Sequence, residues 1–218
     1  MAVIITVAQQ KGGAGKTTLA ASLAAALAAT RKVAVLDIDP QRSLARWHAL
    51  RTARKVPPVH LSDISGWRLA GEIDKLKRSF DVILVDSPPQ IDTDAKLAIR
   101  AADLVLIPVQ PSPPDLWAAE GTLKLAASEK RPTRILLNRA PASGKLRATV
   151  EAELAAQGLQ RLTATLGNRQ GFANAFAHPG EVAHLHRRIP LSRSRSEDRR
   201  ACNPSRCKAS RLPTATSA

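Results

Sequence analysis

Residues 10–18 read Gln10-Lys11-Gly12-Gly13-Ala14-Gly15-Lys16-Thr17-Thr18, and this stretch decides the fold. It follows a short, largely β-branched run (3–8) and leads into an alanine-rich segment (17–29) of high helix propensity. The glycines let the backbone curl, so that successive N–H groups face an anion at the start of the helix. A strand, a glycine-rich loop and a helix in this order predict a phosphate-binding loop.

Two side chains of the loop supply what a nucleotide phosphate needs. Lys16 brings a positive charge to the β and γ phosphates, and the Thr17 hydroxyl can ligate Mg²⁺. The usual pattern, G-x-x-x-x-G-K-[ST], has glycine where this chain has Gln10, and a second lysine, Lys11, follows directly. A glycine-rich turn that carries lysines by coincidence is the alternative, and the strand and helix on either side of the loop count against it.

More short apolar runs follow along the chain, separated by helix-capable sequence: residues 33–36, 82–85, 104–109 and 135–137. Continuous rather than alternating hydrophobicity is typical of strands covered on both faces, so we expect an α/β fold with a mostly parallel sheet flanked by helices on both faces. Residues 162–166 are expected as a last strand and 171–177 as a short helix. Two runs end in an acid, Asp37 and Asp86, and we expect both to point toward the ligand, because the carboxyl ends of parallel strands form the ligand crevice.

The charge of the chain indicates a polyanionic partner. Its 218 residues include 33 Lys+Arg and 18 Asp+Glu, a formal net charge of +15. Aromatic residues make up 3 % and tyrosine is missing, which argues against binding single-stranded nucleic acid by base stacking. Both cysteines, Cys202 and Cys207, lie in the last part of the chain, and no apolar run approaches membrane-spanning length, so we expect a cytoplasmic protein.

The composition changes near residue 180. Residues 181–218 contain nine Lys+Arg against three Asp+Glu, are rich in Arg, Ser and Pro, and have almost no periodic apolar residues. Such a segment cannot offset its ordering entropy, so we expect one domain over residues 1–180 followed by a disordered basic tail. His184 and His186 with the two cysteines of the tail would be poorly spaced for zinc.

With Lys11 ahead of the glycines, residues 11–17 resemble the K-G-G-x-G-K-[ST] hallmark of the deviant Walker A ATPases, the ParA and MinD group. The resemblance covers about residues 1–180 and is greatest to the small plasmid ParA partition ATPases. It implies a P-loop NTPase fold that binds ATP and Mg²⁺ and hydrolyses ATP slowly under the stimulus of a partner. It also implies a nucleotide-sandwich homodimer, in which Lys11 reaches the phosphates of the other subunit. An ordinary solvated lysine is the alternative for Lys11.

The two acidic motifs acquire roles from the same resemblance. Asp37-Ile38-Asp39-Pro40-Gln41 is similar to the switch I region, whose second acid, Asp39, positions the attacking water. The implied catalytic residues are Lys11, Lys16 and Asp39. Asp39 also fits the N-cap of a helix through residues 43–54, with Pro40 at the first helical position. Asp86 resembles the Walker B acid, which with Thr17 would hold Mg²⁺.

The remaining nucleotide contact implied by the resemblance is Asn138, at the position that reads the adenine edge. An amide offers the donor and acceptor that adenine needs, although a loop amide near a strand end is also a common turn former. The implied nucleotide-binding set is Lys11, Gly12, Gly13, Ala14, Gly15, Lys16, Thr17, Thr18 and Asn138.

The group's members bind nonspecific DNA as ATP dimers, and this chain offers several basic residues for that task. Phosphate neutralisation needs no stacking aromatics, so a basic body suffices, and a merely solvated face is the alternative. The candidates are Arg139, Lys145, Arg147, Arg161 and Arg169. The resemblance further implies a ParB-type or other centromere-binding stimulator protein and a nucleoid-associated location.

The tail departs from the group's usual closing amphipathic helix, and its origin has two explanations. Residues 181–218 are either a natural DNA-contacting arm or the product of a reading-frame shift, and the abrupt change of composition favours the second. A MinD-like spatial regulator would need an amphipathic C-terminal helix with an apolar face, which this tail lacks, so no membrane partner is expected. An inactive nucleotide-binding remnant is the third functional alternative.

Overall fold

The computed structural model describes residues 1–64, 66–90, 92–141 and 143–167. Within these residues, seven β-strands form one sheet in the order β3-β2-β4-β1-β5-β6-β7, and every neighbouring pair is parallel. The strands are β1 (Val3–Val7), β2 (Val33–Asp37), β3 (His60–Asp63), β4 (Val82–Asp86), β5 (Leu104–Val109), β6 (Thr133–Ala140) and β7 (Arg161–Gly167). The helices are α1 (Lys16–Leu27), α2 (Ser43–Thr52), the 3₁₀ turn η1 (Gly66–Arg68), α3 (Leu69–Leu76), α4 (Thr93–Ala101), α5 (Pro113–Ser128) and α6 (Lys145–Ala156).

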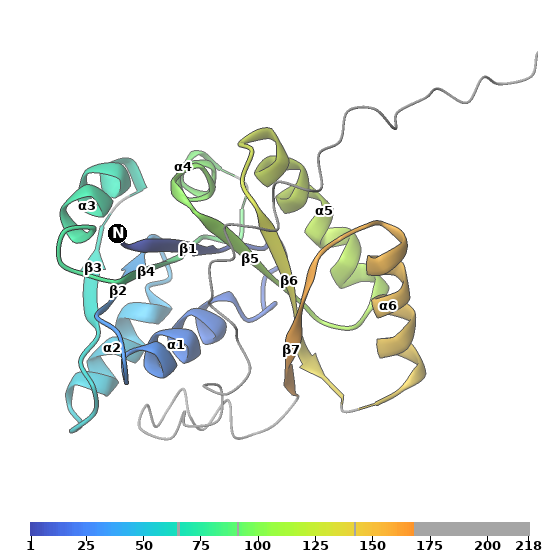
Figure 1. Ribbon diagram of the computed structural model, residues 1–218, viewed down its shortest axis with the longest axis horizontal. Coiled ribbons are helices and arrows are strands. Elements are labelled where there is room, and N and C mark those ends of the chain that lie inside the picture. Colours follow the sequence, from blue (N-terminus) through green and yellow to red (C-terminus); the bar gives the residue numbers. More distant parts are fainter. Residues whose placement is uncertain (65, 91, 142, 168–218) are drawn as a thin grey trace, which may run out of the picture.

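Helices cover the sheet on both faces (Figure 1). The chain runs from β1 through β2 to β3 at one edge, then returns to β4 and continues past β1 to β7 at the other edge. Because parallel crossovers are right-handed, α1 and α2 lie on one face and α3 to α6 lie on the other. The direction of winding reverses around β1, so the carboxyl ends of β1, β4 and β2 border the crevice where such sheets bind ligands.

The central strands owe their burial to their sequence. All five residues of β2 and of β4 are buried, and so are the last four of β1. Valine, isoleucine and leucine at consecutive positions give each strand an apolar side chain on both faces, which the two helical layers then cover. The predicted α/β architecture is therefore confirmed, and the sheet is parallel throughout.

The structure also differs from the predicted helices and strands in several places. The edge strand β3 was not predicted, because a four-residue strand with polar His60, Ser62 and Asp63 carries no apolar run. Helix α2 ends at Thr52, two residues before the predicted end. The predicted helix at 171–177, the boundary at residue 180 and the tail of 181–218 all lie outside the described residues. In the described part of the chain, no helix has the length and apolar character needed to cross a membrane.

Candidate functional site

The loop between β1 and α1 has the conformation of an anion cradle. Gly13 and Gly15 have φ of +75° and +91°, a left-handed region that costs other residues free energy. A Cβ atom added to Gly12 or Gly13 would meet no atom within 4 Å, so the mouth of the loop is open. Helix α1 begins at Lys16, with Gly15 as its N-cap and no side-chain cap, which leaves its first N–H groups available to a phosphate.

Lys16 and Asp86 lie together beneath this loop. Burial lowers the pKa of the Lys16 ammonium, and the nearby charges of Asp86 and Asp39 oppose that shift. Asp86, at the end of β4, is fully buried, and burial raises the pKa of its carboxyl to about 7. The Thr17 hydroxyl lies close enough to lower this pKa, yet neither Asp86 oxygen reaches hydrogen-bond geometry with a described residue.

These groups fit a magnesium ion bound beside a nucleotide. Two orphaned carboxylate oxygens on Asp86 and the neighbouring Thr17 hydroxyl are the hard oxygen ligands that Mg²⁺ prefers. The described residues contain no group of three or more His, Cys, Asp or Glu that would hold an ion unaided. Phosphate-loop sites do not need one, because the nucleotide and water complete the coordination sphere.

Asp37, at the end of β2, caps helix α2 instead of pointing at the ligand. Its Oδ2 accepts a hydrogen bond from the Ala45 N–H at 2.9 Å, and its Oδ1 accepts one from the Asp39 N–H at 3.2 Å. The N-cap position is held by Arg42, in the left-handed region at φ +55°, and its side chain makes no capping bond. The prediction that Asp39 is the N-cap of this helix is therefore wrong, because an acid from the adjacent strand satisfies the helix end.

Asp39 remains free for another task. It is half-buried, its Oδ1 accepts the Gln41 N–H at 2.9 Å, and its charge raises the pKa of Lys16. The carboxylate thus lies near the phosphate loop, where a water-positioning acid has to be. Its catalytic role stays a prediction.

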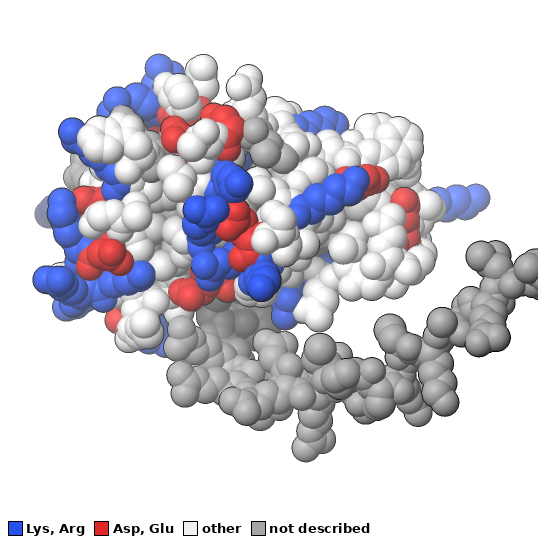
Figure 2. All heavy atoms as spheres, turned by 90° about the horizontal axis from the view of Figure 1, so that it is seen from above, with Lys and Arg blue, Asp and Glu red and all other residues white. Residues whose placement is uncertain are grey.

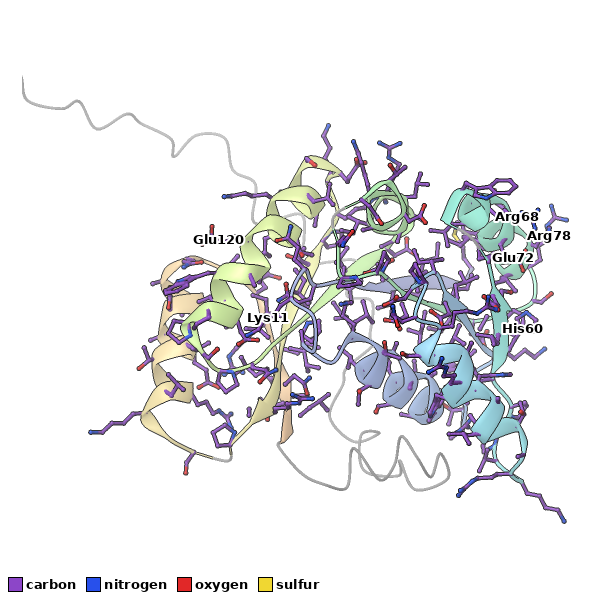
Figure 3. All side chains as sticks on the ribbon, turned by 180° about the vertical axis from the view of Figure 1, so that it is seen from behind. Lys11, His60, Arg68, Glu72, Arg78 and Glu120 are labelled. Carbon is purple, nitrogen blue, oxygen red and sulfur yellow. The ribbon has the colours of Figure 1, made fainter. Side chains whose placement is uncertain are left out.

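Lys11 forms an ion pair within the chain. Its Nζ lies 2.7 Å from Oδ2 of Asp115, in the first turn of α5, and Figure 3 shows Lys11 beside that helix. The Lys11 side chain is 38 % exposed and that of Asp115 only 4 %. The hydroxyl of Ser112, the N-cap of α5, donates to the same Asp115 oxygen. Sequence reasoning missed Asp115, whose only signal is its place directly after Pro113 and Pro114.

Two amide side chains form hydrogen bonds with the backbone at the phosphate loop. The Nδ2 of Asn138, which is 7 % exposed, donates to the Ala14 carbonyl at 2.7 Å, and its Oδ1 accepts the Arg139 N–H at 2.9 Å. Gln9, also missed by sequence reasoning, donates to the Pro108 carbonyl and accepts the Gln10 N–H. Asn138 thus lies against the phosphate loop, with its amide bonded to the backbone, and its reading of the adenine edge stays a prediction.

The candidate DNA contacts divide into two groups. Arg147 and Arg161 come together on Glu151, whose Oε1 lies 3.1 Å and 3.5 Å from their nitrogens and neutralises part of their charge. Arg139 and Lys145 are exposed, and neither forms an ion pair within the described ranges. Arg169 lies outside the described residues.

A phosphate loop after β1 and a buried acid at the end of β4, on a doubly wound parallel sheet, define a P-loop nucleotide-binding protein. The chain belongs to the CobQ/CobB/MinD/ParA nucleotide binding domain family, whose model matches residues 5–178. The resemblance to the ParA and MinD group is thereby confirmed.

Relatives that the chain matches include a carboxysome distribution protein and a chromosome-partitioning ATPase. It is 30 % identical over 197 residues to maintenance of carboxysome distribution protein A of Halothiobacillus neapolitanus, covering 84 % of this chain and 88 % of that protein. It is 34 % identical over 152 residues to the chromosome-partitioning ATPase Soj of Thermus thermophilus, covering 57 % of this chain and 60 % of that protein.

Solved structures share the fold. A variant of McdA from Cyanothece in complex with ATP has a TM-score of 0.71 at 20 % identity, covering 84 % of this chain and 90 % of that one. Cobyrinic acid a,c-diamide synthase from Mycobacterium smegmatis, with a bound ATP analogue and magnesium, has a TM-score of 0.68 at 20 % identity, covering 82 % and 92 %.

Proposed function

We propose that this chain is a ParA-type positioning ATPase, in which Mg-ATP closes a sandwich homodimer that binds nonspecific DNA and hydrolysis resets it. The observation that carries the proposal is the placement of the two loop lysines. Lys16 is buried beneath the loop, while Lys11 is half-exposed beside the loop and, among the described residues, its ammonium is held by Asp115. A buried and an outward lysine on one loop suit phosphates approached from both sides, as in a sandwich.

The residues of this chain divide the work of phosphoryl transfer. The loop N–H groups and Lys16 bind and orient the β and γ phosphates, and Thr17 with Asp86 would hold Mg²⁺, which would supply charge neutralisation at the phosphate oxygens. Asp39 orients the attacking water, since little beyond positioning and charge stabilisation is needed. On closure, Lys11 exchanges Asp115 for a phosphate of the other subunit.

Two kinds of cargo fit this cycle. A DNA element carried by a ParB-type partner follows from the partitioning relatives, such as Soj. A large protein body is the second candidate, because a relative matched over most of its length is a carboxysome distribution protein. Both cargoes use the same nucleotide switch on DNA, so the chain would be nucleoid-associated in either case.

The test is binding to a random-sequence DNA duplex at moderate salt, with ATP or ADP, alongside ATP turnover. We expect the full chain to bind DNA with ATP and not with ADP, and Lys16→Ala to lose both ATP-dependent binding and turnover. Asp39→Ala should keep binding and lose turnover. Lys124→Ala, which removes an exposed lysine paired with Glu120, is the matched control and should behave as the native chain. Equal DNA binding in all nucleotide states would refute the proposal.

A further inference from the structure

Helix α2 and the loop after it form an unusually basic and acid-free stretch. Residues 40–62 contain five Lys or Arg residues and no Asp or Glu. The motifs discussed above do not account for them, since the acidic motif of the nucleotide site ends at Gln41 and the candidate DNA contacts begin at Arg139 in β6. The placement of each basic side chain separates those with a structural task from those without.

Two of the five have a structural task. Arg42 forms an ion pair with Asp63 on β3. Arg51 is buried, lies 5.6 Å from the centre of the Trp47 ring and donates to the Pro57 carbonyl. The other three are exposed and pair with no acid of the described residues: Arg46, Arg54 and Lys55. We call these three residues the α2 basic surface.

Basic residues on the opposite face of the sheet are arranged differently. In Figure 2, which looks onto the side of α3, α4 and α5, red acidic side chains lie beside many of the blue ones. Lysines there are matched to acids within 4 Å: Lys75 to Glu72, Lys77 to Asp74, Lys96 to Glu129 and Lys124 to Glu120. The α2 basic surface therefore lacks the neighbouring acids that balance these four lysines.

Helix stability explains only part of these charges. Cations near a helix C-terminus interact favourably with the helix dipole, which accounts for Arg54 and Lys55. Arg46 lies in the first turn of α2, where a positive charge is unfavourable and acids are preferred. A basic side chain in that position needs a different reason.

The geometry suits a linear array of phosphates. Arg46 lies in the first turn of α2, about 9 Å along the helix axis from its last residue, Thr52, and Arg54 and Lys55 follow just beyond that end. Phosphates of one strand recur about every 3.4 Å along a DNA duplex, so the α2 basic surface spans several of them. Arg31 and Lys32 are exposed in the segment after α1, and α1 packs against α2.

We propose that Arg46, Arg54 and Lys55 bind the phosphate backbone of double-stranded DNA, as a surface separate from the Arg147–Arg161 pair. The proposal rests on the proposed function in taking DNA as the partner. An anionic membrane suits α2 less well, since interfacial helices insert an apolar face and that of α2, with Leu44 and Trp47, is buried in the core. The same burial removes Trp47 as a platform for single-stranded bases.

The test compares two triple variants of the full chain with equal loss of charge. One carries Arg46→Ala, Arg54→Ala and Lys55→Ala, and the control carries Lys75→Ala, Lys96→Ala and Lys124→Ala, which removes lysines paired with acids. Affinity for a random-sequence duplex with ATP is measured over a range of salt concentrations, together with ATP turnover and melting temperature.

We expect the α2 triple variant to lower the slope of log affinity against log salt by roughly 3, since each lost phosphate contact contributes about 0.9. Turnover and melting temperature should match the native chain, and the control should keep the native slope. An unchanged slope in the α2 variant, or an equal fall in the control, overturns the proposal. The proposal is also overturned if the α2 triple variant loses binding to vesicles of anionic lipid while its binding to the duplex stays intact. If the native chain itself does not bind DNA with ATP, the proposed function fails instead.

Discussion

Replacing Asn138 with alanine tests whether this residue serves the phosphate loop or the base. In the structure its Nδ2 donates to the Ala14 carbonyl at 2.7 Å, and its Oδ1 accepts the Arg139 N–H. The side chain is 7 % exposed, so little water can replace it. The loop bends around it so closely that a Cβ atom on Gly15 would lie 2.3 Å from Nδ2.

The expected loss follows from the bonds that are removed. A buried group left without its partner costs about 1–3 kcal/mol, which is roughly 5- to 150-fold in affinity when the nucleotide has to restore the loop. Because the Ala14 carbonyl belongs to the loop and not to the base pocket, every ligand with a triphosphate should lose the same factor. Asn138→Asp should be worse, since it turns a carboxylate oxygen toward that carbonyl.

Titration calorimetry with ATP, GTP and inorganic tripolyphosphate measures the effect. The expected result is an equal fold-loss for all three ligands, with an unchanged preference for ATP over GTP. Gln157→Ala, which removes an exposed amide that bonds to Glu153 on α6, is the control and should bind all three normally. A loss confined to ATP, with tripolyphosphate affinity intact, would refute the loop role and leave base reading as the explanation.

Three further substitutions test the roles of the carboxylates of Asp115, Asp86 and Asp37. Asp115→Asn should free Lys11 and raise the fraction of ATP-bound dimer at a given concentration, measured by sedimentation; a lower dimer fraction contradicts this. Burial raises the pKa of Asp86 from 3.8 to about 7, so the ligand-free chain loses about 4 kcal/mol of stability as pH rises from about 4 to 7. Asp86→Asn should abolish that part of the fall in melting temperature and also Mg-ATP binding; parallel melting profiles of variant and native chain argue against it. Asp37→Ala removes the acceptor for the Ala45 N–H and should cost about 2 kcal/mol, or about 4–8 °C in melting temperature. An unchanged melt would show that α2 does not depend on this cap.

The sequence predicted best those features that are local. The phosphate loop, its strand and its helix occupy one continuous stretch, and the apolar runs of the central strands need no knowledge of their neighbours. The edge strand β3 escaped prediction because an edge needs burial on fewer sides and tolerates polar residues. The end of α2 was mistaken by two residues, which is the ordinary uncertainty of a helix terminus.

Contacts between distant residues could not be predicted. The partner of Lys11, Asp115, lies 104 residues away in the chain, and Gln9 reaches a carbonyl 99 residues away. The capping of α2 by Asp37 depends on how the helix packs beside its strand, while the sequence offered the nearer Asp39 for the same purpose. Each of these depends on tertiary packing that residue spacing alone does not encode.

The pairing of β1 with β4 gives the two halves of the site unequal resistance to local unfolding. Val7 lies in register with Asp86, and the next residue, Ser87, bonds to the Val7 carbonyl through both its N–H and its hydroxyl. The floor of the site can therefore open only when the centre of the sheet opens, and its amides should exchange hydrogen as slowly as global unfolding permits. The segment around Asp39 is held by hydrogen bonds from the Asp39 and Ala45 N–H groups to the Asp37 carboxylate, and it should open at a much lower free energy. The floor of the nucleotide site thus lies in the part of the described chain most resistant to local unfolding, and the segment that carries the predicted water-positioning acid lies in one of the least resistant parts.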